Sequence, residues 1–103
     1  MDFKALGENL GLEEGEFIEI VEIFLDTAFL DIGKLNEAHR DQNCEVASDA
    51  AHSLKGSSGN LGFSEIASLS AAIEDKARNK DISGLDTIIP ILTSLLNQIK
   101  EQL

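Results

Sequence analysis

Apolar residues recur at intervals of three and four positions through most of this chain, which is the spacing that places them on one side of an α-helix. Pro90 is the only proline, and no segment alternates β-branched and polar residues as half-buried strands do. The pattern predicts an all-α protein.

Five segments carry the helical pattern, and they cover residues 2–10, 13–40, 43–61, 64–79 and 83–102. The connections between them are short, so consecutive helices are expected to be antiparallel neighbours. The simplest architecture is an up-and-down antiparallel four-helix bundle with a short N-terminal accessory helix. The chain is long enough for one hydrophobic core, so residues 1–103 are expected to form a single domain.

The segment over residues 13–40 has apolar residues on two sides and is therefore predicted to contact neighbours on both. One stripe contains Phe17, Ile20, Val21, Phe24, Ala28 and Leu35, and the other contains Ile18, Leu25, Phe29 and Ile32. Asn43 and Ser64 are the expected N-caps of the two helices that follow. Pro90 lies inside the last segment, where a proline predicts either a kink or a later helix start.

Charge and cysteine content exclude several classes of protein. The formal net charge is −11 at pH 7, which is unfavourable for binding to nucleic acid or to an anionic membrane. Cys44 is the only cysteine, so an intramolecular disulfide is impossible and a reducing compartment is expected. The N-terminus does not resemble a signal peptide, and no apolar run is long enough to span a bilayer. We expect a cytoplasmic protein.

The run from His52 to Phe63, HSLKGSSGNLGF, contains the residues most suited to chemistry. His52, Lys55 and Gly56 are three and four positions apart, which places them on one face of a helix. Imidazole is a nucleophile near neutral pH, lysine can hold a phosphate, and glycine lets another surface come close. The combination predicts a histidine that carries a phosphoryl group and passes it to a docking protein.

Helical geometry predicts that His52 is exposed and does not belong to the core. At about 100° per residue, one side of the helix collects Ala47, Ala50, Leu54, Ser58 and Leu61. The nearly opposite side collects His52, Ser48, Lys55, Gly56 and Gly59. Glycine inside a helix is unfavourable by about 0.5–1 kcal/mol relative to alanine. Gly56 and Gly59 therefore indicate a flat surface for a partner.

The pattern His52-x-x-Lys55-Gly56-Ser57-Ser58, with Gly62 ten residues after the histidine, closely resembles histidine-containing phosphotransfer (HPt) domains. The similarity extends over essentially the whole chain and includes Ala50-Ala51, Phe63, the Ile73-Glu74 pair, Arg78 and Asp41. In this family the histidine accepts a phosphoryl group from an aspartate of a response-regulator receiver domain and donates it to another. The resemblance therefore implies a phosphorelay intermediate.

The resemblance also implies roles for the residues that match the motif. His52 would be phosphorylated on Nε2, and Lys55 would neutralise the phosphoryl oxygens. Gly56 would let the active site of the receiver reach the imidazole. Ser48 and Gly59 would belong to the same partner-binding face.

Two residues of the following helix are further candidates. Glu74 would accept a hydrogen bond from Nδ1–H of His52, which fixes the tautomer and leaves Nε2 as the nucleophile. Arg78 would hold either Glu74 or phosphate, but an ordinary surface ion pair with Glu74 is equally compatible with their spacing. Ser57 and Ser58 have no base placed to activate them, so they are expected to bond to backbone carbonyls.

Cofactors and partners follow from what the motif needs. The sequence has no Gly-rich phosphate loop followed by lysine and no acidic cluster with metal-ligand spacing. We therefore expect a phosphocarrier that binds no cofactor or metal itself and has no autonomous kinase activity. Its expected partners are receiver domains, which would bring Mg²⁺ and the aspartate, and a hybrid sensor histidine kinase. A monomer is the default state.

Three alternatives compete with this interpretation. Residues 59–63 and Glu74 also resemble the phosphotransfer domain of chemotaxis-type kinases, which receives phosphate from ATP through a separate kinase domain. Continuation of the natural chain past Leu103 would distinguish the two, and the Met1 start favours a standalone protein. A bundle that only binds a partner needs neither His52 nor Lys55. A metal-binding bundle would need more ligands than the two histidines of the chain.

Overall fold

The computed structural model describes residues 2–103, and every regular element in this part of the chain is a helix. The five helices are α1 (Phe3–Asn9), α2 (Glu14–Asp41), α3 (Cys44–Leu61), α4 (Ser64–Arg78) and α5 (Leu85–Glu101). Each boundary lies within two residues of the predicted one. The prediction of an all-α protein is confirmed.

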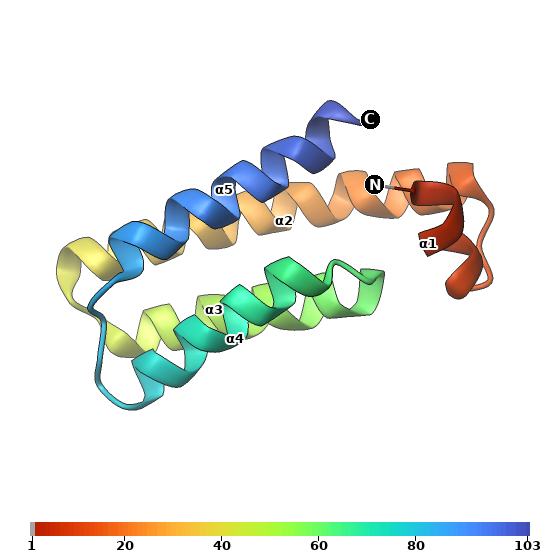
Figure 1. The fold of residues 1–103 in the computed structure, drawn as a ribbon. Coiled ribbons are helices and arrows are strands. Elements are labelled where there is room, and N and C mark those ends of the chain that lie inside the picture. The colour runs from red at the N-terminus through yellow and green to blue at the C-terminus, as the bar shows by residue number, and fades with distance from the viewer. Residues whose placement is uncertain (1) are drawn as a thin grey trace.

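The four long helices lie side by side along the long axis of the molecule (Figure 1). The molecule measures 42 × 21 × 17 Å along its principal axes. α2 contacts α3 and α5, and α4 contacts the same two helices, so the contacts close a ring. Consecutive long helices run in opposite directions, as their short connections predict. α1 packs against α2 at the end of the molecule where both termini lie (Figure 1). No helix within residues 2–103 is long and apolar enough to cross a lipid bilayer.

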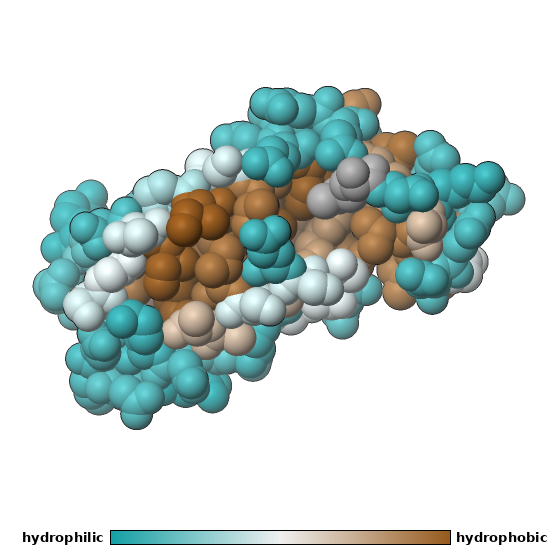
Figure 2. Space-filling model, in the orientation of Figure 1, coloured by the Kyte–Doolittle hydropathy of each residue, from teal (hydrophilic) through white to brown (hydrophobic). Residues whose placement is uncertain are grey.

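The seam between α4 and α5 is the least extensive contact of the ring. Figure 2 shows hydrophobic side chains along this seam, between the hydrophilic surfaces of the two helices. A groove at the end of the seam near α1 is lined by Leu6, Phe63, Ile66 and Leu95. No residue of α3 lines this groove.

Phenylalanine rings join α1 to the rest of the core. Phe17 of α2 lies between Phe3 of α1 and Phe63 of the α3–α4 connection, with ring centroids 6.1 and 6.4 Å apart. Phe24, two turns further along α2, lies 5.4 Å from Phe63. Aromatic rings at these separations attract one another beyond the effect of their burial. The cluster explains how so short a helix as α1 is held in place.

The predicted two-sided packing of α2 is confirmed, with one correction. Val21 and Ala28 are fully buried in one stripe, and Leu25 and Ile32 are buried in the other. Ile20, which was assigned to the first stripe, is 38% exposed. Its position is one residue before Val21, about 100° around the helix, so it lies at the edge of the stripe where the neighbouring helix no longer covers it.

Two predictions about helix ends agree with the structure in part. Asn43 caps α3 as expected, since its Oδ1 accepts a hydrogen bond from the backbone N–H of Val46 at 3.1 Å. Ser64, however, is the first residue of α4, and Phe63 occupies the N-cap position without a side-chain cap. Burial of the Phe63 ring against Phe17 and Phe24 of α2 determines the path of the chain there, and this outweighs the capping preference of serine.

Pro90 neither delays nor interrupts the last helix. α5 begins at Leu85, after Gly84 with φ of 80°, and continues through the proline to Glu101 (Figure 1). Pro90 is exposed on the outer side of α5. A proline there removes one backbone hydrogen bond near the helix start, and the apolar face of α5 compensates by packing into the core. The predicted later start of the helix is wrong.

Candidate functional site

His52 lies near the middle of α3, on the side that faces solvent. Its side chain is 65% exposed. The residues predicted to face inward are all buried, namely Ala47, Ala50, Leu54, Ser58 and Leu61. The prediction that His52 is exposed and does not belong to the core is confirmed.

His52 is joined to Glu74 of α4, which is 22 residues later in the chain. Nδ1 of the imidazole lies 2.6 Å from Oε2 of Glu74. An ionised carboxylate can only accept a hydrogen bond, so Nδ1 must carry the proton and donate it. The neutral ring then has its lone pair on Nε2, and the described residues make no hydrogen bond to that atom. This arrangement leaves the lone pair of Nε2 available to act as a nucleophile.

Glu74 is a nearly buried carboxylate, with 4% of its side chain exposed, and it has two cationic partners besides His52. Lys55 Nζ lies 2.5 Å from Oε1, and Arg78 Nη2 forms an ion pair with Oε2 at 3.0 Å. The hydrogen bond from Lys55 holds the pKa of Glu74 below its ordinary value of 4.5 although burial acts in the opposite direction. The hydrogen bond from His52 and the charge of Arg78 lower the pKa further. Glu74 is therefore ionised at neutral pH.

Glu74 and its two cationic partners beside His52 together carry a net positive charge, although the chain as a whole is acidic. Lys55 and Arg78 each contribute one positive charge against the single negative charge of Glu74. Their side chains are 37% and 62% exposed, so both cations are also accessible to an anion that approaches from solvent. The cluster can therefore attract and partly neutralise a phosphoryl group near Nε2.

The two outward glycines of α3 are not required by packing within the domain. Both are exposed, and a Cβ atom added at Gly56 would meet no atom within 4 Å. A Cβ at Gly59 would meet only the Cβ of Ala67, at the ordinary contact distance of 4.0 Å. Ser48, the third predicted partner-binding residue, is half-buried and lines a hollow together with Arg78. The small size of the glycines therefore keeps the surface beside His52 low.

Ser57 and Ser58 behave as the sequence predicted. The hydroxyl of Ser58 donates to the carbonyl of Leu54 at 2.6 Å and is buried. The hydroxyl of Ser57 donates to the same carbonyl at 3.3 Å. Neither hydroxyl contacts a base within the described residues, and both bond to backbone as expected.

Sequence reasoning missed two features of α2. Ile23 and Leu30 of α2 are each 68% exposed, and their separation of seven residues places them on one side of the helix. Both are large apolar residues that lie outside the two predicted stripes. This was the signal in the sequence from which an exposed apolar surface could have been predicted. Asp31 of α2 is buried and accepts a hydrogen bond from Ser53, the residue after His52. An acidic residue beside an apolar stripe gives no signal of such a partner.

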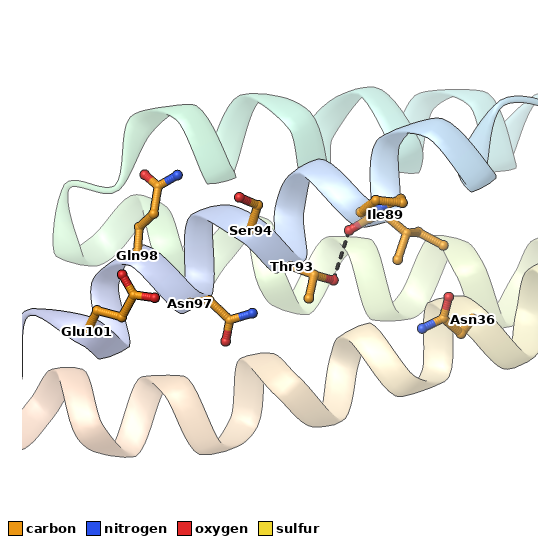
Figure 3. A pocket seen from close by; sticks show the side chains of 8 residues that line it. Asn36, Ile89, Thr93, Ser94, Asn97, Gln98 and Glu101 are labelled. Carbon is orange, nitrogen blue, oxygen red and sulfur yellow. Dashed lines mark hydrogen bonds between the residues drawn. The ribbon is translucent and has the colours of Figure 1, made fainter.

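The surface hollows are not lined by His52 itself, although two of them include its neighbours Ser48, Ser53 and Arg78. Figure 3 shows one of about 490 Å³ between α2 and α5, lined mostly by polar side chains such as Asn36, Thr93 and Asn97. Neither this hollow nor the groove at the end of the α4–α5 seam includes His52 or Glu74. Within residues 2–103, no three His, Cys, Asp or Glu side chains are grouped so that they could hold a metal ion. The group of His52, Lys55, Glu74 and Arg78, called the reactive cluster below, lies on an open helix surface. Such a surface suits contact with a docking protein better than the binding of an enclosed small molecule.

Comparisons with known proteins agree with this geometry. A family model described as the Hpt domain matches residues 19–102. None of the curated proteins matches the sequence. The crystal structure of histidine-containing phosphotransfer protein B (HptB) from Pseudomonas aeruginosa PAO1 has the same fold, with a TM-score of 0.78 and 21% identity over 100% of this chain and 96% of that one. The chain therefore belongs to the Hpt domain family, and it is a histidine phosphotransfer intermediate of a phosphorelay.

Proposed function

We propose that His52 is the residue that carries the phosphoryl group, and that it accepts the group from one receiver-domain aspartate and donates it to another. The observation that carries this proposal is the 2.6 Å contact between Nδ1 of His52 and Glu74, which leaves Nε2 free on an exposed side chain. The other histidine, His39, is half-buried in the last turn of α2 and has no comparable partner among the described residues.

The transfer step follows from the charges around the imidazole. The lone pair of Nε2 attacks the phosphorus, an N–P bond forms, and the bond from phosphorus to the aspartate oxygen breaks, which releases the receiver's carboxylate. The ring keeps its Nδ1 proton and becomes positively charged, and the carboxylate of Glu74 stabilises that charge. Lys55 and Arg78 are available to neutralise the phosphoryl oxygens. The reverse sequence returns the phosphoryl group to the next aspartate.

The domain is proposed to be a phosphocarrier without kinase activity of its own. The sequence contains no nucleotide-binding loop, and the reactive cluster is open to solvent, whereas phosphoryl transfer from ATP requires a site that holds the nucleotide and its metal. The receiver domain would supply Mg²⁺ together with the aspartate. A hybrid sensor kinase and response regulators are the proposed partners, and cytoplasmic location and a monomeric state stay predictions.

The proposed docking surface is the outward face of α3 in an up-and-down four-helix bundle. Gly56 and Gly59 keep this face low, so that a receiver could approach the imidazole. The exposed side chains of Ile23 and Leu30 on the adjacent helix α2 would add apolar area. An interface with an apolar centre and few charged pairs suits brief contacts with more than one receiver.

Phosphotransfer from a phosphorylated receiver in the presence of Mg²⁺ tests the proposal. The wild-type protein and the matched control His39→Gln are expected to acquire an acid-labile, base-stable label, whereas His52→Gln is not. Label that persists in His52→Gln would show that another residue carries the phosphoryl group. Label that appears only with ATP and a separate kinase domain would favour the chemotaxis-type alternative.

A further inference from the structure

Two buried carboxylates, one on each helix adjacent to α3, form hydrogen bonds with consecutive residues of α3. Glu74 of α4 bonds to His52, and Asp31 of α2 accepts a hydrogen bond of 3.0 Å from the hydroxyl of Ser53. Asp31 and Glu74 are each 3% exposed, and they are the charged residues that are buried within residues 2–103. Since Glu74 already has a role at the imidazole, the purpose of Asp31 requires an explanation.

Asp31 is expected to lower the stability of the fold at its position, because its carboxyl group is buried. It follows the exposed Leu30 and precedes the buried Ile32 on α2. Burial raises the pKa of Asp31, and the hydrogen bond from Ser53 and the charge of Lys34 offset only part of that effect. The hollow beside it also contains Asp49, a second negative charge. An apolar side chain in place of Asp31 would avoid this desolvation.

In α3, the small size of the buried residues lets a hydrogen bond to a neighbouring helix contribute to holding the helix in place. Most of its buried residues are small, and they are Ala47, Ala50, Ala51 and Ser58, beside the larger Leu54 and Leu61. Helices pack when ridges of side chains on one helix fit into the grooves of its neighbour, and small side chains form low ridges. In a helix packed mainly through small residues, hydrogen bonds to both adjacent helices add contacts that fix its rotation.

We propose that Asp31 is a positioning residue for the phosphotransfer reaction, which holds α3 through Ser53 in the rotation that keeps His52 against Glu74. The inference rests on the proposed role of His52. Asp31 does not touch the imidazole or the phosphoryl group. It acts on α2's side of α3 while Glu74 acts on α4's side, so that neither contact alone determines the direction of the imidazole.

Replacement of Asp31 by leucine separates positioning from stability. Asp31→Leu removes the acceptor for Ser53 together with the buried charge, so the Tm is expected to equal or exceed that of the wild type. The single-turnover rate at saturating receiver is expected to fall roughly three- to tenfold, because a misdirected imidazole attacks less often. The receiver concentration at half-saturation should not change, since Asp31 is buried and cannot contact the receiver. Asp31→Asn keeps a side-chain oxygen acceptor and should restore most of the rate.

A double-mutant cycle tests whether the hydrogen bond itself is responsible. Ser53→Ala is expected to slow transfer in the wild-type background and to have no further effect in Asp31→Leu, because the contact is already absent. Additive losses would overturn the proposal, as would a wild-type rate in Asp31→Leu or a rate in Asp31→Asn as low as in Asp31→Leu.

The imidazole itself provides a measurement that needs no receiver. Nitrogen-15 NMR of the His52 ring distinguishes the Nδ1–H tautomer from the Nε2–H tautomer. Asp31→Leu is expected to increase the Nε2–H fraction, and an unchanged ratio would contradict the proposal. If His52→Gln still accepted phosphate, the proposed function would fail, whereas the tautomer ratio would still decide whether Asp31 positions His52.

Discussion

Glu74 contacts side chains of two helices because its two oxygens meet different neighbours. Oε2 meets His52 and Arg78, and Oε1 meets Lys55, so one carboxylate joins α3 to α4 and orients the imidazole. A buried carboxylate of this kind is favourable only while its partners remain in place. Its ionisation is therefore linked to the stability of the whole domain.

Glu74→Gln is expected to lose less stability than the wild type on acidification. The folded-state pKa of Glu74 lies below its ordinary value of 4.5, so the unfolded chain takes up the proton first as the pH falls. The stabilising contribution of Glu74 is therefore complete above 4.5 and is lost as the pH falls through the folded-state pKa. Urea unfolding of both proteins at several values between about pH 3 and pH 7 measures the difference.

Asp31 provides an internal comparison for this experiment. Its pKa is raised, so the folded state takes up its proton first, and its effect on stability has the opposite sign. That effect is present in both the wild type and Glu74→Gln, and it cancels in the comparison. An equally steep loss of stability in the variant would mean that Glu74 is not the group responsible.

At the scale of the element, α3 has small residues on both faces for different reasons. Alanines on the inner face let the helix pack closely, whereas glycines on the outer face meet nothing within the domain. An outer glycine therefore lowers the stability of the helix without a compensating internal contact. We attribute this loss to the need for a receiver to approach His52.

Gly56→Leu is expected to increase the stability of the domain while it weakens receiver docking. The new side chain has open space around it, and the replacement of a helical glycine stabilises by about 0.5–1 kcal/mol. The receiver concentration at half-maximal transfer should rise, because the side chain stands beside the imidazole. Gly33→Leu is the matched control, since Gly33 is also exposed inside a helix with open space around its Cβ position.

These two variants should therefore agree in unfolding experiments and differ in transfer experiments. Similar increases in Tm with a transfer defect in Gly56→Leu alone would support the docking surface. Unimpaired transfer by Gly56→Leu would remove the reason for a glycine at this position.

At the scale of the whole molecule, the ring of helices brings His52 and Glu74 together. The two residues are 22 positions apart, and the contact between α3 and α4 depends on the common core that all four long helices share. A substitution that weakens core packing should therefore lower the stability of the domain even where it removes no residue of the site. α5, which contributes no residue to the reactive cluster, offers the clearest test.

Leu92→Ala is expected to destabilise the domain by about 2–5 kcal/mol, because Leu92 is fully buried and the substitution leaves a cavity. Ile91→Ala, at the preceding position, is expected to change stability by less than about 1 kcal/mol, since Ile91 is 45% exposed. Chemical unfolding of both variants measures the difference. Equal losses would contradict the arrangement of α5 in the core.

The sequence by itself determined the properties that depend on positions within one helix. The five helices, the exposure of His52 and the outward position of Gly56 follow from the period of about 3.6 residues per turn, and the structure agrees with each. His52 could be proposed as the nucleophile because its neighbours at three and four positions are local. The pairing of Glu74 with His52 was expected only from the resemblance to a family.

The tertiary structure alone decided the features that depend on how different helices meet. This group contains the exposure of Ile20, the buried Phe63 at the N-cap position of α4, and the contact between Asp31 and Ser53. Helical periodicity gives the direction of each side chain from its own axis but not the register of one helix against the next. That register is set by the packing of side chains that are distant in the sequence, which no local pattern contains.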